Sequence, residues 1–201
     1  MYEVFKNYLD SKIELSEDDA IRIKAVSIVK KLRKWQYLLQ ADDVWKYNAF
    51  VTRGCLRTYS VDEKGTEHIL AFAIENWWAG DRESLRSGKP SRFNIDAVED
   101  TEVILITKAN FEMLCKEIPA LNSMVSELLE RSFVASQNRI EAAISYTAEQ
   151  KYLNFIERYP GFANRLPQAM IASYLGITPE TLSRVRNQSL KLKSISDLTH
   201  H

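Results

Sequence analysis

The 201-residue sequence has few of the residues that mark disulfide-rich, metal-binding or membrane-spanning proteins. Its two cysteines, Cys55 and Cys115, have neither the number nor the spacing of a disulfide framework or a zinc site. Its longest apolar runs, such as Ile69–Ile74, are far shorter than the roughly 20 residues that cross a bilayer. Met1–Asp10 mixes aromatic and charged residues and does not have the pattern of a signal peptide. We therefore expect a cytoplasmic protein with reduced thiols and no membrane segment.

Histidine is also scarce, because His68 is the only one of three that lies away from the C-terminal end. A metal-dependent enzyme on a β-barrel of the cupin type needs several histidines beside a carboxylate, and one histidine cannot assemble that cluster. The sequence also lacks the G-x-S-x-G, Walker and dinucleotide-binding glycine motifs. These absences disfavour an enzyme, which we keep only as an alternative hypothesis.

The net charge of the chain is zero, which argues against non-specific binding of nucleic acid through overall positive charge. The charges are unevenly placed: residues 148–201 contain seven Lys or Arg and four Asp or Glu, giving this segment +3 and the preceding residues −3. The composition, 45% hydrophobic and 27% charged, is that of a globular chain. Its length leaves room for one medium domain or two small ones.

Residues 26–106 have the composition of β-structure. Short runs rich in Val, Ile, Trp, Tyr and Phe predict strands at Trp35–Leu39, Ala49–Arg53, Cys55–Val61, His68–Ile74 and Val103–Ile106. Asp62–Gly65 has the composition of a hairpin turn, and Gly54 indicates a bulge. Many short strands with tight turns predict an antiparallel sandwich or barrel. Before them, residues 1–25 carry apolar side chains at helical spacing and predict an amphipathic helical lead-in.

Residues 119–146 predict one long helix, with Pro119 well placed in its first turn. Two apolar stripes follow it: Leu121, Val125, Leu128, Ala135 and Ala142 on one side, and Leu129, Phe133, Ile140 and Ile144 on the other. A helix that is apolar on two sides must be covered on two sides. Either this helix is buried inside one domain, or its second side pairs with the same helix of another copy as in a coiled coil. We favour the dimer.

The segment after residue 146 has the signals of a helix-turn-helix. Thr147–Gln150 has the form of a capping box, so a new helix and a new domain begin near Thr147. Within residues 167–186, Gly176 provides a sharp turn, Thr178 caps the next helix and Pro179 occupies its first position. Two short helices joined by a glycine-containing turn are the helix-turn-helix pattern.

The second helix of this motif has a free face with the chemistry of major-groove recognition. Its residues at i, i+3, i+4 and i+7 lie opposite the apolar Leu182 and Val185 and are Glu180, Ser183, Arg184 and Asn187. Arginine can donate two hydrogen bonds to guanine, and glutamate can accept one from cytosine. The alternative is an ordinary surface ion pair between Glu180 and Arg184, worth only about 0.3–0.5 kcal/mol. The adjacent turn and the basic C-terminal segment favour DNA recognition, with Thr178 and Thr181 completing the predicted contact set.

Three segments together are similar to one known family. Ile171–Arg184 resembles its helix-turn-helix, and the Glu-Thr-Leu-Ser-Arg core resembles the recognition helix of its Fnr branch. Phe50–Tyr59, with the pattern Phe-Val-x-x-Gly-x-Leu-Arg-x-Tyr, resembles its β-roll together with Gly65-Thr-Glu and Ile69–Phe72. Residues 119–146 match its dimerisation helix. The chain therefore resembles the Crp/Fnr transcription regulators over most of its length.

The resemblance implies an α+β fold: an N-terminal antiparallel β-roll of the double-stranded β-helix or jelly-roll type, a long dimerisation helix and a C-terminal winged helix-turn-helix. The expected domains are residues 1–118, 119–146 and 147–201. The implied function is sequence-specific DNA binding by a homodimer joined through residues 119–146, on a palindromic operator whose half-sites lie about 34 Å apart. Glu180 and Arg184 would read base edges with support from Ser183, and RNA polymerase is a further expected partner.

The chain departs from the family pattern at its phosphate cassette. Members that bind cyclic nucleotides carry Gly-Glu-Leu followed by Arg-Ser/Thr-Ala, whereas this chain has Gly80-Asp81-Arg82-Glu83 and then Ser91-Arg92-Phe93. If the predicted strand Phe93–Val98 fixes the alignment, Ser91 replaces the arginine, and Arg92 is displaced to the opposite face. We expect no cyclic nucleotide and predict no definite cofactor. The residues left to line an effector pocket are Trp78, Asp81, Arg82, Ser91 and Arg92.

Other features of the family are also reduced here. Two cysteines sixty positions apart cannot supply the four thiolates of an iron–sulfur cluster, and His68 on a β-run is a packing residue rather than a haem ligand. Asn187–His201 has no two-strand pattern, which predicts a reduced wing, with Lys191 and Lys193 partly replacing its phosphate contacts. The reduced wing supports a third hypothesis, a β-roll interaction module that does not bind DNA.

Overall fold

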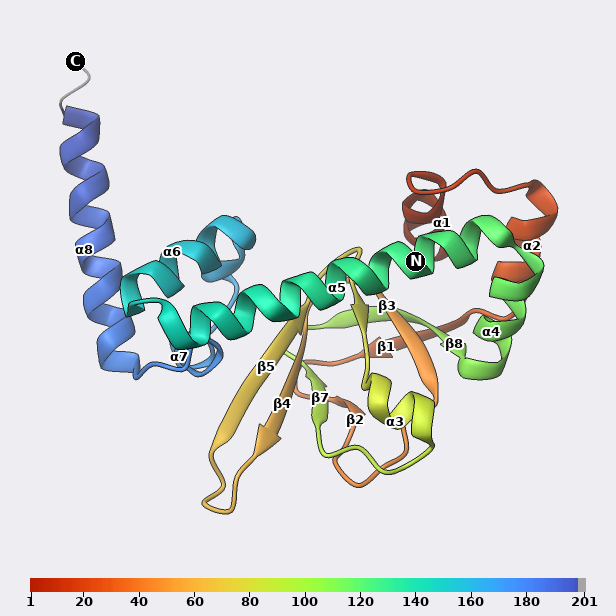
Figure 1. The fold of residues 1–201 in the computed structure, drawn as a ribbon, viewed down its shortest axis with the longest axis horizontal. Coiled ribbons are helices and arrows are strands. Elements are labelled where there is room, and N and C mark those ends of the chain that lie inside the picture. Colours follow the sequence, from red (N-terminus) through yellow and green to blue (C-terminus); the bar gives the residue numbers. More distant parts are fainter. Residues whose placement is uncertain (199–201) are drawn as a thin grey trace. The chain divides into compact units, whose positions relative to one another are not determined.

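A computed structural model describes residues 1–198 of the chain (Figure 1). It forms two compact units, Met1–Arg131 and the residues from Ser132 onward, each described here by itself. The long helix α5 (Pro119–Ser145) confirms the predicted helix and belongs to both units. The compact units divide within this helix, so the three-part domain division stays a prediction.

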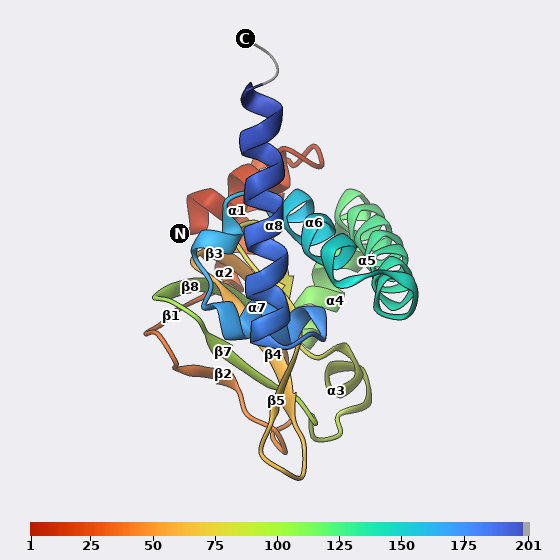
Figure 2. The same ribbon diagram turned by 90° about the vertical axis from the view of Figure 1, so that its left-hand side faces the viewer.

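The first unit contains two four-stranded sheets in which every pairing is antiparallel, which confirms the predicted class of β-fold (Figure 2). The first sheet has the order β1 (Ile28–Leu32), β8 (Thr101–Thr107), β3 (Tyr47–Arg53) and β6 (Trp78–Ala79). The second has the order β2 (Tyr37–Leu39), β7 (Asn94–Ala97), β4 (Leu56–Val61) and β5 (Glu67–Ala73).

One apolar core takes alternate residues from strands of both sheets. It contains Leu39, Val51, Leu56, Ile95 and Ala97. Trp45, before β3, is also buried in this core. Gly80 has φ +144°, and a Cβ atom there would come within 2.5 Å of the Trp45 Nε1 atom. The core therefore depends on glycine at position 80.

A second apolar core includes residues of the first sheet, the N-terminal helices and the helices that follow β8. Its helices are α1 (Tyr2–Asp10), α2 (Glu17–Ala25), α4 (Lys108–Glu117) and the first part of α5. Phe5 and Phe50 have ring centroids 4.8 Å apart, and Trp78 makes edge contacts with both rings. The predicted helical lead-in is confirmed, with Ser16 capping α2 through the Asp19 N–H.

Several predicted strand boundaries were wrong, for local reasons. β2 begins at Tyr37 because Trp35 lies in a turn with φ +67°. Gly54 forms no bulge: it follows the end of β3 with φ +91°, and the chain then enters β4 of the other sheet. The irregularity lies just before it, as a register shift between Val51 and Arg53. The hairpin turn is confirmed, since the Asp62 carboxylate accepts the N–H groups of Lys64 and Thr66.

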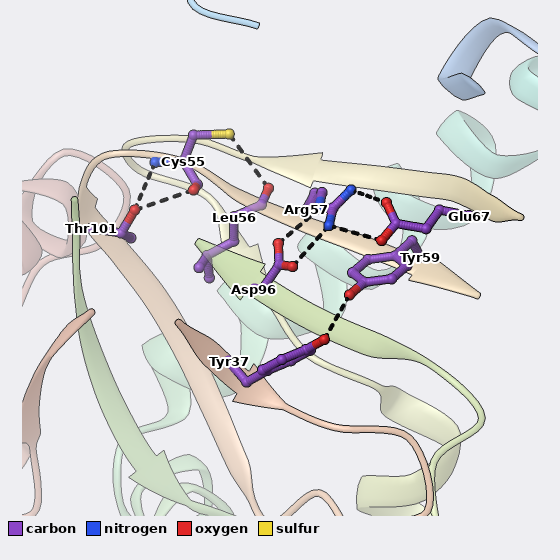
Figure 3. A network of polar contacts seen from close by, with 8 residues as sticks. All are labelled: Tyr37, Cys55, Leu56, Arg57, Tyr59, Glu67, Asp96 and Thr101. Atoms are coloured by element: carbon purple, nitrogen blue, oxygen red, sulfur yellow. Dashed lines mark hydrogen bonds and ion pairs between the residues drawn. The ribbon is translucent and has the colours of Figure 1, made fainter. Parts of the chain in front are cut away.

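A buried ion-pair network joins three strands of the second sheet (Figure 3). Successive strand residues point to opposite faces, so Arg57 and Asp96 lie on the face away from Leu56 and Ile95. Arg57 Nε and Nη2 donate to the two oxygens of Asp96 at 2.8 and 2.9 Å, and Arg57 also pairs with Glu67. The carboxylate hydrogen bonds raise the pKa of Arg57 against the opposing effect of burial.

The second unit consists of the C-terminal part of α5 and a group of packed helices. These are α6 (Ala148–Arg158), the 3₁₀ turn η1 (Phe162–Asn164), α7 (Gln168–Leu175) and α8 (Pro179–Leu198). The predicted capping box is confirmed, because Thr147 and Gln150 exchange side-chain to backbone hydrogen bonds. The rings of Phe155, Tyr159 and Tyr174 join α6 to α7.

The last helix is longer than the sequence predicted, since α8 continues to Leu198. Within the described residues no strand follows β8, and the reduced wing stays a prediction. The side chains of Lys191 and Lys193 lie outside the described part, as do His200 and His201 altogether. No helix in the described part of the chain is both long and apolar enough to span a membrane.

The ion-pair network predicts an asymmetric response to mutation. Replacing Arg57 with Met leaves the Asp96 carboxylate, whose side chain is only 4% exposed, without its cation. We expect the free energy of unfolding in urea to fall by about 3–5 kcal/mol, as for other broken buried pairs. The double variant Arg57→Met/Asp96→Leu should be more stable than the single variant. A double variant at least as unstable as Arg57→Met would contradict this account of the network.

Candidate nucleic-acid interface

The turn between α7 and α8 is built by a glycine in the left-handed region. Gly176 has φ +65° and ends α7, and its N–H donates to carbonyls of the preceding turn. The Ile177 N–H donates to the Ala172 carbonyl at 3.1 Å, which is the longer-range bond of a Schellman motif. These bonds satisfy the last carbonyls of α7 and redirect the chain into α8.

The N-terminus of α8 is capped by side chains. Thr178 Oγ1 accepts a hydrogen bond from the Thr181 N–H at 3.2 Å and donates one to Thr181 Oγ1 at 3.1 Å. Hydrogen bonds from its own backbone N–H and from Thr178 lower the pKa of Glu180. The Glu180 side chain thus provides a hydrogen-bond acceptor at the start of the helix.

The two faces of α8 differ sharply in exposure. Leu182 and Val185 of α8 are buried, as are Ile171 and Ala172 of α7. The predicted DNA-contacting side chains Glu180, Ser183, Arg184 and Asn187 are all exposed and line one continuous surface with Pro179 and Gln188. Thr178 caps the helix start, and Thr181 lies in its first turn, where its N–H donates to Thr178 Oγ1. The structure thus places five of the six predicted residues on the exposed surface, with Thr181 half-buried.

Three of the four residues of the second apolar stripe of α5 are exposed to solvent in the single chain, and Leu129 is half-buried. Phe133, Ile140 and Ile144 are 65%, 61% and 80% exposed. On the first stripe, by contrast, Leu121 is buried in the core of the first unit, and Val125 and Leu128 pack against that core. Exposed isoleucine and phenylalanine side chains in a row on one helix indicate a surface for another protein chain.

The cassette region of the first unit is closed by its own side chains. The Asp81 carboxylate caps α3 (Arg82–Ser87) by accepting the N–H groups of Glu83 and Ser84 at 2.9 and 3.2 Å. Ser91 Oγ, which is buried, donates to the same carboxylate at 2.7 Å. The N–H groups of Glu83 and Ser84, which could otherwise bind a phosphate, therefore already donate to a carboxylate of the chain itself. The residues present here do not fit a cyclic nucleotide.

The five residues predicted for an effector pocket do not converge on one pocket. Asp81 and Ser91 are hydrogen-bonded to each other, but Trp78 belongs to the second core, with Phe50 and Phe111. The Arg92 guanidinium stacks over the Phe93 ring at 4.9 Å. The exposed Arg82 lies on α3, with α4 across a groove.

The buried Arg57–Asp96 pair was missed by reasoning from the sequence. In the sequence, the only sign of this ion pair is a charged residue at a non-core position in each of two neighbouring strands. Which strands pair with one another cannot be predicted from the sequence of one strand alone. In the described residues no group of three His, Cys, Asp or Glu side chains is placed to hold a metal ion.

Comparisons with known proteins agree with this architecture. A family model described as the cyclic nucleotide-binding domain matches residues 29–118. The chain is 26% identical over 183 residues to the regulatory protein HlyX of Actinobacillus pleuropneumoniae, covering 85% of this chain and 75% of that protein. It is 28% identical over 170 residues to the fumarate and nitrate reduction regulatory protein of Escherichia coli K12, covering 78% and 66%.

Among solved structures, FixK2 from Bradyrhizobium japonicum is similar with a TM-score of 0.71 and 22% identity. The match covers 84% of this chain and 86% of that one. At this level of identity the likeness establishes the fold.

The turn predicts a specific effect of substitution at Gly176. A Cβ atom at this position meets nothing within 4 Å, so Gly176→Ala adds only the strain of a positive φ. We expect a loss of about 1–2 kcal/mol in the stability of the second unit, measured by thermal unfolding. Ala172→Gly, which removes a methyl group from the packed side of α7, is the comparison variant. An unchanged melting temperature for Gly176→Ala would contradict the left-handed turn.

Proposed function

The chain belongs to the Crp/Fnr family of transcription regulators, and from this premise we propose that it binds a palindromic DNA operator as a homodimer. In this proposal it acts in the cytoplasm as a sequence-specific regulator in contact with RNA polymerase. The relatives named above are regulators, and the chain is not an enzyme. The observation that carries the proposal is the exposed face of α8, whose side chains are those of major-groove recognition.

In the proposed complex, the N-terminal half of α8 enters the major groove. The Arg184 guanidinium donates two hydrogen bonds to guanine O6 and N7, and the Glu180 carboxylate accepts from cytosine N4. Both side chains are exposed on the same face. Ser183 and Asn187 extend this face along the helix and contact bases or phosphates. In this proposal α8 carries the main share of base recognition.

The proposed dimer forms through the second stripe of α5. Covering Phe133, Ile140 and Ile144 with the same stripe of a second copy removes a large apolar surface from water, at roughly 25 cal/mol per Å² buried. A twofold axis at this helix pair relates two α8 helices, as a palindromic operator requires. The same helix begins in the first unit, where Leu121 and Met124 are buried. In this proposal it couples the first unit to the DNA-binding unit.

In this proposal the β-roll does not respond to a cyclic nucleotide. Asp81 and Ser91 satisfy each other where a cyclic phosphate would need donors. The protein is therefore expected to bind DNA in the absence of any cyclic nucleotide.

The first test is selection of binding sites from random duplex DNA, with purified protein and no added ligand. We expect a palindrome with G·C pairs in each half-site. Arg184→Ala should lose about 1–3 kcal/mol of discrimination at one base pair of each half-site, which is roughly 5-fold to 150-fold in relative affinity.

Arg33→Ala is the matched control, because it removes an exposed arginine from the first unit. It should leave the selected sequence unchanged. Recovery of the same palindrome by wild type and Arg184→Ala would reject the assigned role of Arg184. Recovery of no sequence by a folded, dimeric wild type would instead favour an interaction module that does not bind DNA.

The second prediction concerns the dimer. Ile140→Glu places a charge in the middle of the exposed apolar stripe and should convert the protein to a monomer in sedimentation equilibrium. Asn138→Glu adds the same charge on the opposite side of the same helix, where the side chain is exposed, and should leave the dimer intact. A dimer that survives Ile140→Glu, or is lost equally in both variants, would count against this interface.

A further inference from the structure

A groove on the first unit lies outside both the β-roll interior and the DNA-binding surface. It has a volume of about 1010 Å³ and is formed by α3, by one side of α4 and by the first turns of α5. We call it the α3–α4 groove (these helices are labelled in Figures 1 and 2). Its volume is at the upper end of the range for small-molecule sites, roughly 300–1,000 Å³.

Apolar side chains from all three helices line the groove. They are Leu85 of α3, Phe111 and Cys115 of α4, and Pro119 and Val125 of α5. Phe111 is buried, and Leu85, Cys115 and Val125 are half-buried, so these groups belong to the packed body of the unit. A ligand seated on them would need an apolar body.

The charged residues of the groove are predominantly basic. Four cationic side chains line it, against two carboxylates, Glu83 and Glu112; the cations are Arg82, Arg86, Lys108 and Lys116. Lys108 is already engaged, since its Nζ donates to the Arg86 carbonyl at 3.2 Å and lies 4.0 Å from Glu112 Oε1. Arg82, Arg86 and Lys116 form no ion pair within the part of the chain that the structure describes.

We propose that the α3–α4 groove binds an organic carboxylate with an extended apolar body, such as a medium-chain fatty acid. The apolar body contacts Leu85, Phe111 and Val125, and the carboxylate pairs with the guanidinium groups of Arg82 and Arg86. Arginine is suited to this role because its planar fork binds a carboxylate with two parallel hydrogen bonds.

The two parts of the groove together select this class of ligand. A compact inorganic anion such as phosphate would satisfy the arginines but leave the apolar side chains without a partner. A neutral hydrocarbon would cover the apolar side chains but leave the arginines unpaired. Only a molecule with both parts uses the whole groove.

The position of the groove beside α5 suits a ligand that acts as an effector of the regulator. Pro119, Asn122 and Val125 of its lining lie in the first turns of α5, the helix that continues into the second unit. The role of effector rests on the proposed function, whereas binding in the groove does not. The test below therefore measures binding without DNA, and its failure would leave the proposed function untouched.

Cys115 provides a reporter inside the groove. It is half-buried, and burial together with Glu112 raises the pKa of its thiol. Cys55 is buried elsewhere in the unit and serves as an internal reference. The rate of Cys115 alkylation by iodoacetamide is measured at about pH 9, where more of the thiol is ionised, by mass spectrometry of the Cys115 peptide.

The probes are decanoate below its micelle concentration, decanamide as the uncharged match, and inorganic phosphate. We expect decanoate to slow alkylation of Cys115 several-fold in a saturable way, while decanamide and phosphate have little effect. The variant Arg82→Gln/Arg86→Gln should weaken decanoate protection about ten-fold or more, because it removes charge-assisted hydrogen bonds. Arg33→Gln, an exposed arginine outside the groove, is the control and should behave as wild type.

Three results would overturn the proposal. The first is the absence of protection by decanoate. The second is equal protection by decanamide, or full protection in the Arg82→Gln/Arg86→Gln variant, either of which would mean apolar partitioning without recognition of the carboxylate. The third is protection by phosphate alone, which would indicate a simple anion site.

Discussion

The proposed dimer depends on one constraint, the presence of apolar side chains on two sides of α5. The first side is satisfied within the chain, where Leu121 and Met124 are buried. The second side is not, because Phe133, Ile140 and Ile144 remain exposed. A single helix cannot bury both sides against one unit. We therefore propose that a second copy of the chain covers the second side. The proposed pairing also supplies the symmetry that a palindromic operator requires, and thereby links packing to DNA recognition.

The helix-turn-helix was predictable from the sequence because its signals are local. A capping threonine, a proline in the first turn and a glycine with positive φ each act on backbone within a few residues of themselves, so the positions of Thr178, Pro179 and Gly176 predicted the turn directly. The sheets were less predictable, since strand pairing depends on residues far apart in the sequence. β1 has two lysines at its centre, which interrupt its apolar pattern, and β6 has only two residues, so neither was recognised as a strand.

The candidate effector pocket was also poorly predictable, because the positions of its side chains depend on strand pairing. Trp78 is close in sequence to Asp81, but β6 pairs with β3 and places Trp78 opposite Phe50, so both rings point into the second core. From the cassette sequence we predicted that Ser91 stands where the family has an arginine, and this stays a prediction. The sequence could not predict that Asp81 and Ser91 would bond to each other, because that contact depends on how α3 and β7 are brought together.

The most direct test of the central claim is the dependence of DNA affinity on the spacing between half-sites. The selected operator would be compared with versions carrying five additional base pairs, or about ten, at its centre, with the number of chains per duplex determined by native mass spectrometry. We predict two chains on the selected operator, with half-sites about one helical turn apart. Five additional base pairs turn one half-site to the opposite side of the duplex and should cause a large loss of affinity. One chain per duplex, with an affinity independent of spacing, would contradict this prediction.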